Sequence, residues 1–150
     1  MKKLAEVEEA TALMHEAVDW SVMKWLTEKK RVRKIADKAN DALWAMQKEV
    51  KSRWSAELTT AYGELGKGDG EGTPTTSAEL RSLARRVKDA DDEAWRAHLD
   101  AEATFDKAEK ILSTSMAREG CRKAILSWEL CAKAIVAAEA DIRSGSVGQH

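Results

Sequence analysis

The residues in this sequence whose types and spacing could do chemistry form two clusters of lysine and arginine. Residues 24–38 carry seven cationic and two acidic side chains, for a net charge of +5, and residues 107–123 carry five and two, for a net charge of +3. Such clusters bind phosphate groups through their charge and through the release of counterions. The candidate anion-binding residues are Lys29, Lys30, Arg31, Arg33, Lys34, Arg118, Arg122 and Lys123.

Trp20 and Trp25 lie beside the first cluster, where an indole ring could stack on a nucleic-acid base or rest at a membrane interface. The whole chain, however, has a net charge of −1, so only a local field can attract an anion. Charged runs along helices are also usually solvated faces. We therefore treat an anion-binding module, for nucleic acid or an acidic surface, as the alternative function, with nucleic acid as the less favoured partner.

The patterns expected for metal, cofactor or catalytic chemistry are absent from the sequence. A di-metal helical bundle needs a glutamate three residues before each of two histidines. The residues at that spacing before His15 and His98 are an alanine and a tryptophan. No motif for a catalytic nucleophile occurs either. We therefore predict a non-enzymatic protein with no metal site and no cofactor.

Two long helical segments must position the charged clusters. Apolar or small residues recur every three or four positions through 2–65, which is the pattern of one helix about 90 Å long, and similar spacing runs through 77–143. Between them, 66–76 holds four of the eight glycines and the only proline, and therefore predicts a turn. We expect a single domain with helical arms at 2–65 and 77–143, a Gly-rich turn at 66–76 and a flexible tail at 144–150.

An antiparallel hairpin would align the two arms so that paired residue numbers sum to about 142. This register places the acidic residues 89–93 opposite Lys48, Lys51 and Arg53. It also brings Trp44 near the level of Trp95 and sets the two basic clusters at the same height. The match of opposite charges favours this register over its neighbours.

The predicted fold is all-α, a long antiparallel helical hairpin of coiled-coil type that pairs with a second copy into a four-helix bundle. The arms are expected to be continuous because no glycine or proline interrupts the first arm before Gly63. The alternative is a monomeric three- or four-helix bundle with breaks near Asn40 and Gly120.

The pairing surface of the predicted homodimer follows from side chains that fall off the main apolar stripe of the first arm. Trp20 and Trp44 lie more than about 100° from that stripe on a helix, and such exposed tryptophans indicate a second contact surface. The candidate interface residues are Leu13, Trp20, Met23 and Trp44. Our first functional hypothesis is therefore a helical interaction or scaffold protein that forms a dimer; the sequence does not identify another protein partner.

Two features bear on the compartment. The sequence has no apolar run of signal-peptide type at its start and no stretch long enough for a transmembrane segment. Cys121 and Cys131 lie ten residues apart, roughly 15 Å along a helix, which is too far for a disulfide between them. Since nothing requires an oxidising compartment, we expect a cytoplasmic protein.

Overall fold

The computed structural model describes residues 2–65 and 77–143, and it describes side chains for residues 5–65 and 77–139. The predicted turn at 66–76 and the predicted tail at 144–150 lie outside the described residues. All regular structure in the described part is helical, which confirms the all-α prediction. The helices are α1 (Lys2–Ala17), α2 (Val22–Ser52), α3 (Ala56–Leu65), α4 (Ala78–Lys110) and α5 (Thr114–Arg143).

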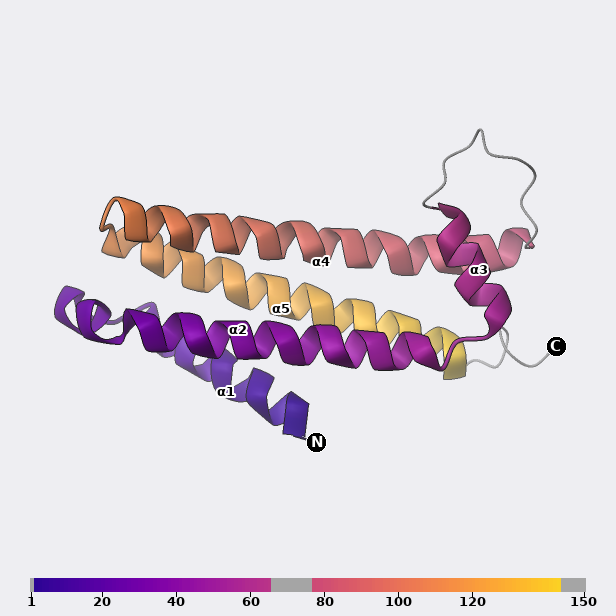
Figure 1. Ribbon diagram of the computed structural model, residues 1–150, viewed down its shortest axis with the longest axis horizontal. Helices are drawn as coiled ribbons and strands as arrows, with labels where there is room; N and C mark the ends of the chain where they lie inside the picture. The colour runs from indigo at the N-terminus through magenta and orange to yellow at the C-terminus, as the bar shows by residue number, and fades with distance from the viewer. Residues whose placement is uncertain (1, 66–76, 144–150) are drawn as a thin grey trace.

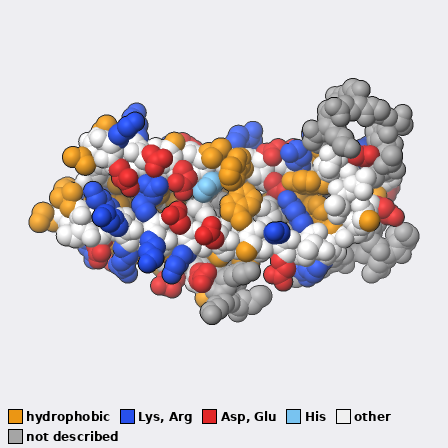
Figure 2. Space-filling view, viewed as in Figure 1, with side chains coloured by type: hydrophobic (Ala, Val, Ile, Leu, Met, Phe, Trp, Pro, Cys, Tyr) orange, Lys and Arg blue, Asp and Glu red, His pale blue; other side chains and the backbone are white. Residues whose placement is uncertain are grey.

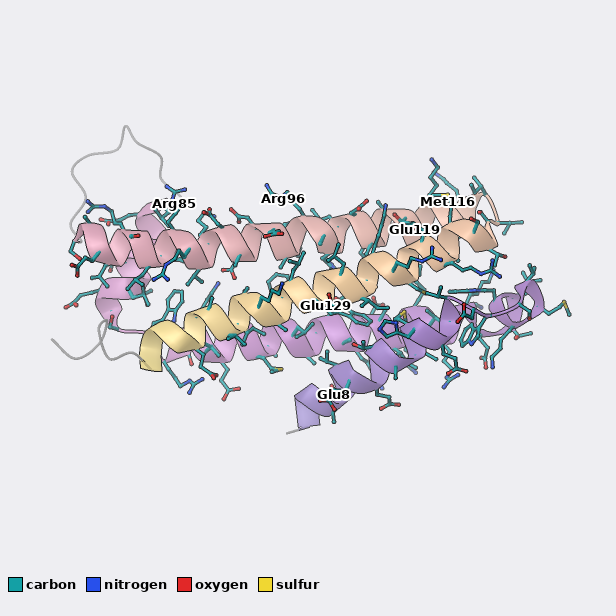
Figure 3. The ribbon with its side chains drawn as sticks, turned by 180° about the vertical axis from the view of Figure 1, so that it is seen from behind. Glu8, Arg85, Arg96, Met116, Glu119 and Glu129 are labelled. Atoms are coloured by element: carbon teal, nitrogen blue, oxygen red, sulfur yellow. The ribbon has the colours of Figure 1, made fainter. Side chains whose placement is uncertain are left out.

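Three long helices form the body of the molecule (Figure 1). Helices α2 and α5 run in the same direction, and α4 runs against both. Helix α4 packs along α5, and the shorter α1 folds back onto α2 and α5 over about half of their length. Helix α3 crosses α4 at the end of the bundle that is opposite the α1–α2 turn. Seen from behind, in Figure 3, α1 lies across α5 and α2, and Glu8 points away from them.

The prediction that the first arm is one continuous helix is wrong. The chain turns at residues 18–21 and again at 53–55, and a serine caps the helix that follows each turn. The Oγ of Ser21 accepts a hydrogen bond from the Lys24 amide at 3.2 Å, and the Oγ of Ser55 accepts one from the Leu58 amide at 3.1 Å. Serine caps of this kind satisfy the free amides of a first helical turn, so helices can begin without glycine or proline.

The second arm also breaks, at residues 111–113. Leu112 adopts a left-handed backbone conformation with φ 54°, and the Ser113 amide donates to the Ala108 carbonyl at 2.9 Å. Together they form the Schellman ending of a helix, in which glycine is the usual left-handed residue. The Ser113 hydroxyl then caps α5 by accepting from the Met116 amide at 3.1 Å. Because leucine occupies the left-handed position where glycine is usual, the sequence pattern does not predict this turn.

The two break points of the alternative prediction are wrong as well, because both residues lie inside helices. Asn40 is in the middle of α2, where its Oδ1 accepts a hydrogen bond from Trp128 Nε1 at 2.8 Å. Gly120 is buried in α5, and a Cβ atom built on it would lie 2.8 Å from Cδ1 of Phe105. Gly120 therefore gives the Phe105 ring room between α4 and α5 and does not end a helix.

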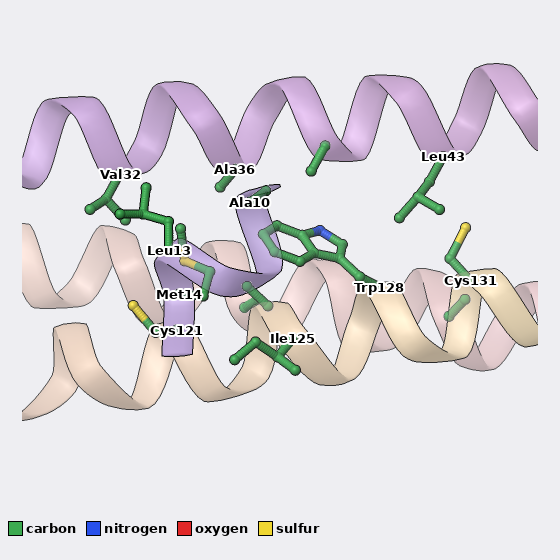
Figure 4. Close-up of a cluster of buried hydrophobic side chains, with 14 of the residues drawn as sticks. Ala10, Leu13, Met14, Val32, Ala36, Leu43, Cys121, Ile125, Trp128 and Cys131 are labelled. Atoms are coloured by element: carbon green, nitrogen blue, oxygen red, sulfur yellow. The ribbon is translucent and has the colours of Figure 1, made fainter. Parts of the chain in front are cut away.

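The main core cluster lies between α1, α2, α4 and α5, and Figure 4 shows the part of it where α1, α2 and α5 meet. Helix α1 contributes Ala10, Leu13, Met14 and Ala17, all of them buried. Trp128 of α5 is also buried in this cluster. Small residues on α1 let it approach its neighbours closely, so a helix of only four or five turns can be held on the bundle.

The predicted alignment of the two arms survives as the alignment of α2 with α4. Lys51 Nζ lies 2.6 Å from Asp91 Oδ2, and Arg33 Nη1 lies 3.0 Å from Glu109 Oε1. In both pairs the residue numbers sum to 142. Helices α2 and α4 are bridged mainly by such long side chains, whereas α5 packs directly against both.

Candidate functional site

One end of the bundle exposes a group of large apolar side chains. It is the end at which the turn between α1 and α2 and the turn between α4 and α5 lie together (Figure 1). Figure 2 shows hydrophobic side chains gathered there with lysine and arginine next to them. Leu112 is 77% exposed and Met23 is 72% exposed. We call the group the apolar end; its residues are Val22, Met23, Leu26, Ile111 and Leu112.

A hydrogen bond joins the two turns that build the apolar end. Nη2 of Arg118, on α5, donates to the carbonyl oxygen of Trp20 at 2.7 Å. Trp20 and Trp25 are buried next to this bond, with ring centroids 5.4 Å apart in an edge-to-face arrangement. The exposed side chains are therefore carried by turns that are tied together and supported by packed aromatic rings.

A small apolar cavity of about 60 Å³ lies next to the exposed side chains. Leu26 and Leu112 line it on the exposed side, and Trp25 and Phe105 line it from the core. Nε1 of Trp25 is buried and has no hydrogen-bond partner among the described residues. The cavity is large enough to admit a methyl or methylene group, but it is too small for a complete small molecule.

Unpaired lysines surround the apolar end. The following four, on the second and third turns of α2 and the last turn of α4, make no hydrogen bond or ion pair through their side chains with a described residue: Lys29, Lys30, Lys107 and Lys110. Nearby acids are mostly engaged, because Glu16 lies 3.9 Å from Lys24 and Glu28 lies 3.6 Å from Arg31. Asp19 is the unpaired acid on this side of the described structure. The surroundings of the apolar end therefore carry an excess of free positive charge.

The predicted basic cluster is less positive than its residue count suggests. Arg33 donates to Glu102, Asp106 and Glu109 at 3.0–3.2 Å, and Lys123 lies 3.1 Å from Asp100. Three of these acids precede residue 107 and so fall outside the segment counted in the sequence. Arg31, Arg118 and Arg122 are also engaged, through Glu28, the Trp20 carbonyl and Glu119. Of the eight candidates, Lys29, Lys30 and Lys34 make neither a side-chain hydrogen bond nor an ion pair with a described residue.

The prediction that four side chains form an exposed dimer surface is wrong for two of them. Leu13 and Trp20 are buried within the chain, because the turn at 18–21 folds α1 back onto α2 and α5. Met23 is exposed, but at the apolar end. Trp44 packs against Trp95 of the same chain, with ring centroids 5.5 Å apart. The four residues therefore do not form one surface.

A buried carboxylate, that of Asp91, joins α2, α3 and α4. Asp91 accepts hydrogen bonds from Gln47 Nε2, from Lys51 Nζ at 2.6 Å and from the Tyr62 hydroxyl at 2.6 Å. Burial, together with the hydrogen bond to Asp91, raises the pKa of Tyr62 well above its ordinary value of 10.0. The spacing could have revealed this position, since Asp91 lies four residues after Val87 and three before Ala94, both buried.

The thiols of Cys121 and Cys131 are buried, and their surroundings make them unreactive. Burial raises the pKa of Cys121 from 9.0 to about 12 and that of Cys131 to about 11. A thiol must ionise to act as a nucleophile or as a metal ligand, so neither cysteine is prepared for that chemistry. Within the described residues, no three histidine, cysteine or acidic side chains come together as metal ligands.

Comparisons with protein-family models, with curated proteins and with solved structures find no match for this chain. None of the described helices is both long enough and apolar enough to cross a membrane. The function must therefore be inferred from the geometry and charge of the exposed sites. The most distinctive of these is the apolar end with its unpaired lysines.

Proposed function

We propose that this protein is a non-enzymatic interaction module that attaches through its apolar end to an anionic lipid surface. The observation that carries the proposal is the combination of exposed apolar side chains on two adjoining turns with unpaired lysines around them. Apolar side chains at the tip of a molecule can enter the headgroup region, and cations beside them are attracted to acidic headgroups.

The expected strength is that of reversible attachment. A lysine close to an anionic membrane contributes about 1 kcal/mol, so four contribute about 4 kcal/mol, which alone corresponds to a dissociation constant near 1 mM. Insertion of Met23 and Leu112 adds to this through the burial of apolar surface. Because the lysines are exposed, salt should weaken the attachment.

Two other uses of the apolar end fit less well. A second copy docking end to end would bring two groups of unpaired lysines together, which opposes such a dimer. Nucleic acid would need cations along a track and aromatic faces open for stacking. Trp20, Trp25 and Phe105, the aromatic residues described at this end, are buried. The anionic lipid surface is the partner that uses both the exposed apolar groups and the charge.

The test is flotation of the full chain with lipid vesicles. We expect binding to phosphatidylcholine vesicles that contain phosphatidylserine, much less binding without phosphatidylserine, and a decrease at high salt. Met23→Ser should reduce binding several-fold. Leu126→Ser is the matched control, because Leu126 is similarly exposed on the middle of α5 and should bind like the unaltered chain.

Three results would overturn the proposal. The first is a chain that ignores anionic vesicles at low salt. The second is binding that Leu126→Ser reduces as much as Met23→Ser does. The third is tight binding to single-stranded DNA without vesicle binding, which would favour a nucleic-acid module. Light scattering should accompany these measurements, since a dimer that Met23→Ser dissociates would assign the apolar end to self-association.

A further inference from the structure

We propose a second binding site, on the side of the bundle, for the trimethylammonium group of an organic cation. It lies between α2 and α4, away from the apolar end, and its walls are Trp44 and Trp95. Figure 2 shows hydrophobic side chains beside a histidine near the middle of this face, with acidic side chains next to them. The site depends on a different set of residues from the proposed function and can exist without it.

Two tryptophans from facing helices form the aromatic part of the site. The ring centroids of Trp44 and Trp95 lie 5.5 Å apart, and the ring planes meet at 70°. Nearly perpendicular rings at this distance are in edge-to-face contact, and the indole surface left exposed beside that contact can attract a cation. Trp95 is 46% exposed, so part of this indole surface is open to solvent, and His98 packs against Trp95 at 5.3 Å between centroids.

The tryptophans border an open hollow of about 400 Å³ on the surface of the bundle. Its other lining residues are polar, and three of them are acidic: Asp37, Asp41 and Glu102. Arg33 neutralises Glu102 by an ion pair at 3.2 Å. Asp37 and Asp41 make no ion pair or hydrogen bond through their side chains with a described residue. Two free carboxylates therefore lie beside the exposed indole surface.

This combination favours an alkylated ammonium over other ligands. The π faces and the carboxylates both attract positive charge, and both disfavour anions. Lys34 and Lys38 lie on neighbouring positions of α2 but do not line the hollow. A primary ammonium such as lysine is strongly hydrated, and it loses more on leaving water than a methylated ammonium does. The trimethylammonium group could come from a small molecule, a lipid headgroup or a trimethylated lysine.

The indole protons offer a direct measurement. The chain has six tryptophans, hence six indole N–H signals in a nitrogen–proton correlation spectrum, and Trp44→Phe and Trp95→Phe each remove and so assign one. On titration with choline, we expect these two signals to shift most. The neutral isostere 3,3-dimethylbutan-1-ol has the same shape without the charge and should shift them far less.

Substitutions test the contributions of the tryptophans and of the carboxylates separately. Trp44→Ala should weaken choline binding about tenfold or more, and Trp44→Phe by less, because one π face is retained. The double variant Asp37→Asn with Asp41→Asn should weaken binding several-fold. Asp89→Asn, an exposed acid elsewhere on α4, is the matched control and should change nothing. Circular dichroism shows that each variant remains helical.

Further titrations identify the source of the cation. Binding of a peptide with trimethylated lysine, but not of its unmodified form, would assign a protein partner. Binding to pure phosphatidylcholine vesicles that Trp44→Ala abolishes would assign a lipid headgroup. Binding of choline alone would assign a free metabolite. The proposal is overturned if choline shifts neither indole signal, if the isostere matches choline, or if Asp89→Asn weakens binding as much as the double variant does.

Discussion

The two ends of this bundle are built in opposite ways. At the end closed by α3, the apolar side chains Leu58, Ala61 and Ala84 are fully buried, and the polar atoms of Asp91 all have partners. At the apolar end, large side chains face solvent, one leucine holds a left-handed backbone, and nearby lysines lack partners. Folding requires the first arrangement and gains nothing from the second. The difference is what directs attention to the apolar end as a place of binding.

Substitution of Asp91 should cause the largest change in the free energy of unfolding. It should destabilise the end of the bundle that α3 closes. Asp91→Ala would leave Lys51, Gln47 and Tyr62 without their shared acceptor, at a cost of about 3 kcal/mol in the free energy of unfolding. Urea unfolding followed by circular dichroism measures it. Asp89→Ala, at an exposed position two residues earlier, should stay within about 0.5 kcal/mol of the unaltered chain. Equal effects would show that Asp91 is an ordinary surface acid.

Alanine substitutions at Gly120 and Gly63 should change the stability of the fold in opposite directions. Gly120→Ala places a methyl group 2.8 Å from the buried Phe105 ring, and we expect it to destabilise by about 1–2 kcal/mol despite the better helix propensity of alanine. Gly63→Ala, in α3, meets open space and should stabilise by about 0.5–1 kcal/mol. Thermal unfolding of the two variants distinguishes them. A stabilising Gly120→Ala would mean that α4 and α5 can separate freely at this point.

Leu112→Gly should separate stability from binding at the apolar end. Glycine takes the left-handed conformation without the steric cost that leucine bears, so the variant should be more stable by about 0.5–1 kcal/mol. It should nevertheless bind anionic vesicles more weakly, because an exposed apolar side chain is lost. Leu126→Gly, inside α5, should instead destabilise by about 1 kcal/mol and leave vesicle binding unchanged. Unchanged binding by Leu112→Gly would remove Leu112 from the proposed contact.

The smallest change concerns the thiols at moderately alkaline pH. Cys121 and Cys131 stay protonated when folded, with pKa values raised to about 12 and 11, and ionise near pH 9 when unfolded. Their contribution to stability is therefore complete below pH 9 and is lost as pH rises from 9 towards 11–12, with less than about 0.5 kcal/mol lost for each thiol at pH 9. Melting temperatures between pH 7 and 10 should fall less steeply in Cys121→Ala and in Cys131→Ala than in the unaltered chain, because each variant lacks one thiol with a raised pKa. Equal slopes in all three chains would show that the folded thiols are as solvated as the unfolded ones.

Much of the architecture could be predicted from the sequence, because it depends on periodicity and charge. The helical spacing gives the all-α fold, and complementary charges align Lys51 with Asp91 on α2 and α4. The break positions could not be predicted, since they depend on serine caps and on a leucine in a conformation typical of glycine. Once α1 folds back, Leu13 and Trp20 change from expected surface residues to core residues.

The candidate sites were only partly foreseen for the same reason. Lys29 and Lys30 were identified from composition, but their freedom from ion pairs depends on which acids each helix places opposite them. Arg33 was identified in the same way, but it is not free, because three carboxylates of α4 pair with it. Ile111 and Leu112 lie within the arm for which the sequence predicts one continuous helix. In such a helix an apolar pair would be expected in the core. Their exposure follows from the turn that they form.

The hydrogen bond from Arg118 to the Trp20 carbonyl closes a loop of chain that contains α2, α3 and α4. Helix α1 lies outside that loop and is held on α2 and α5 by buried side chains such as Leu13 and Met14. A helix outside such a loop can open at a lower free energy than the whole bundle, although its opening exposes the core side chains that it covers. Amide protons of α1 should then exchange with solvent ahead of those of α2, and α1 is the part of the described chain whose detachment would give the molecule a second shape.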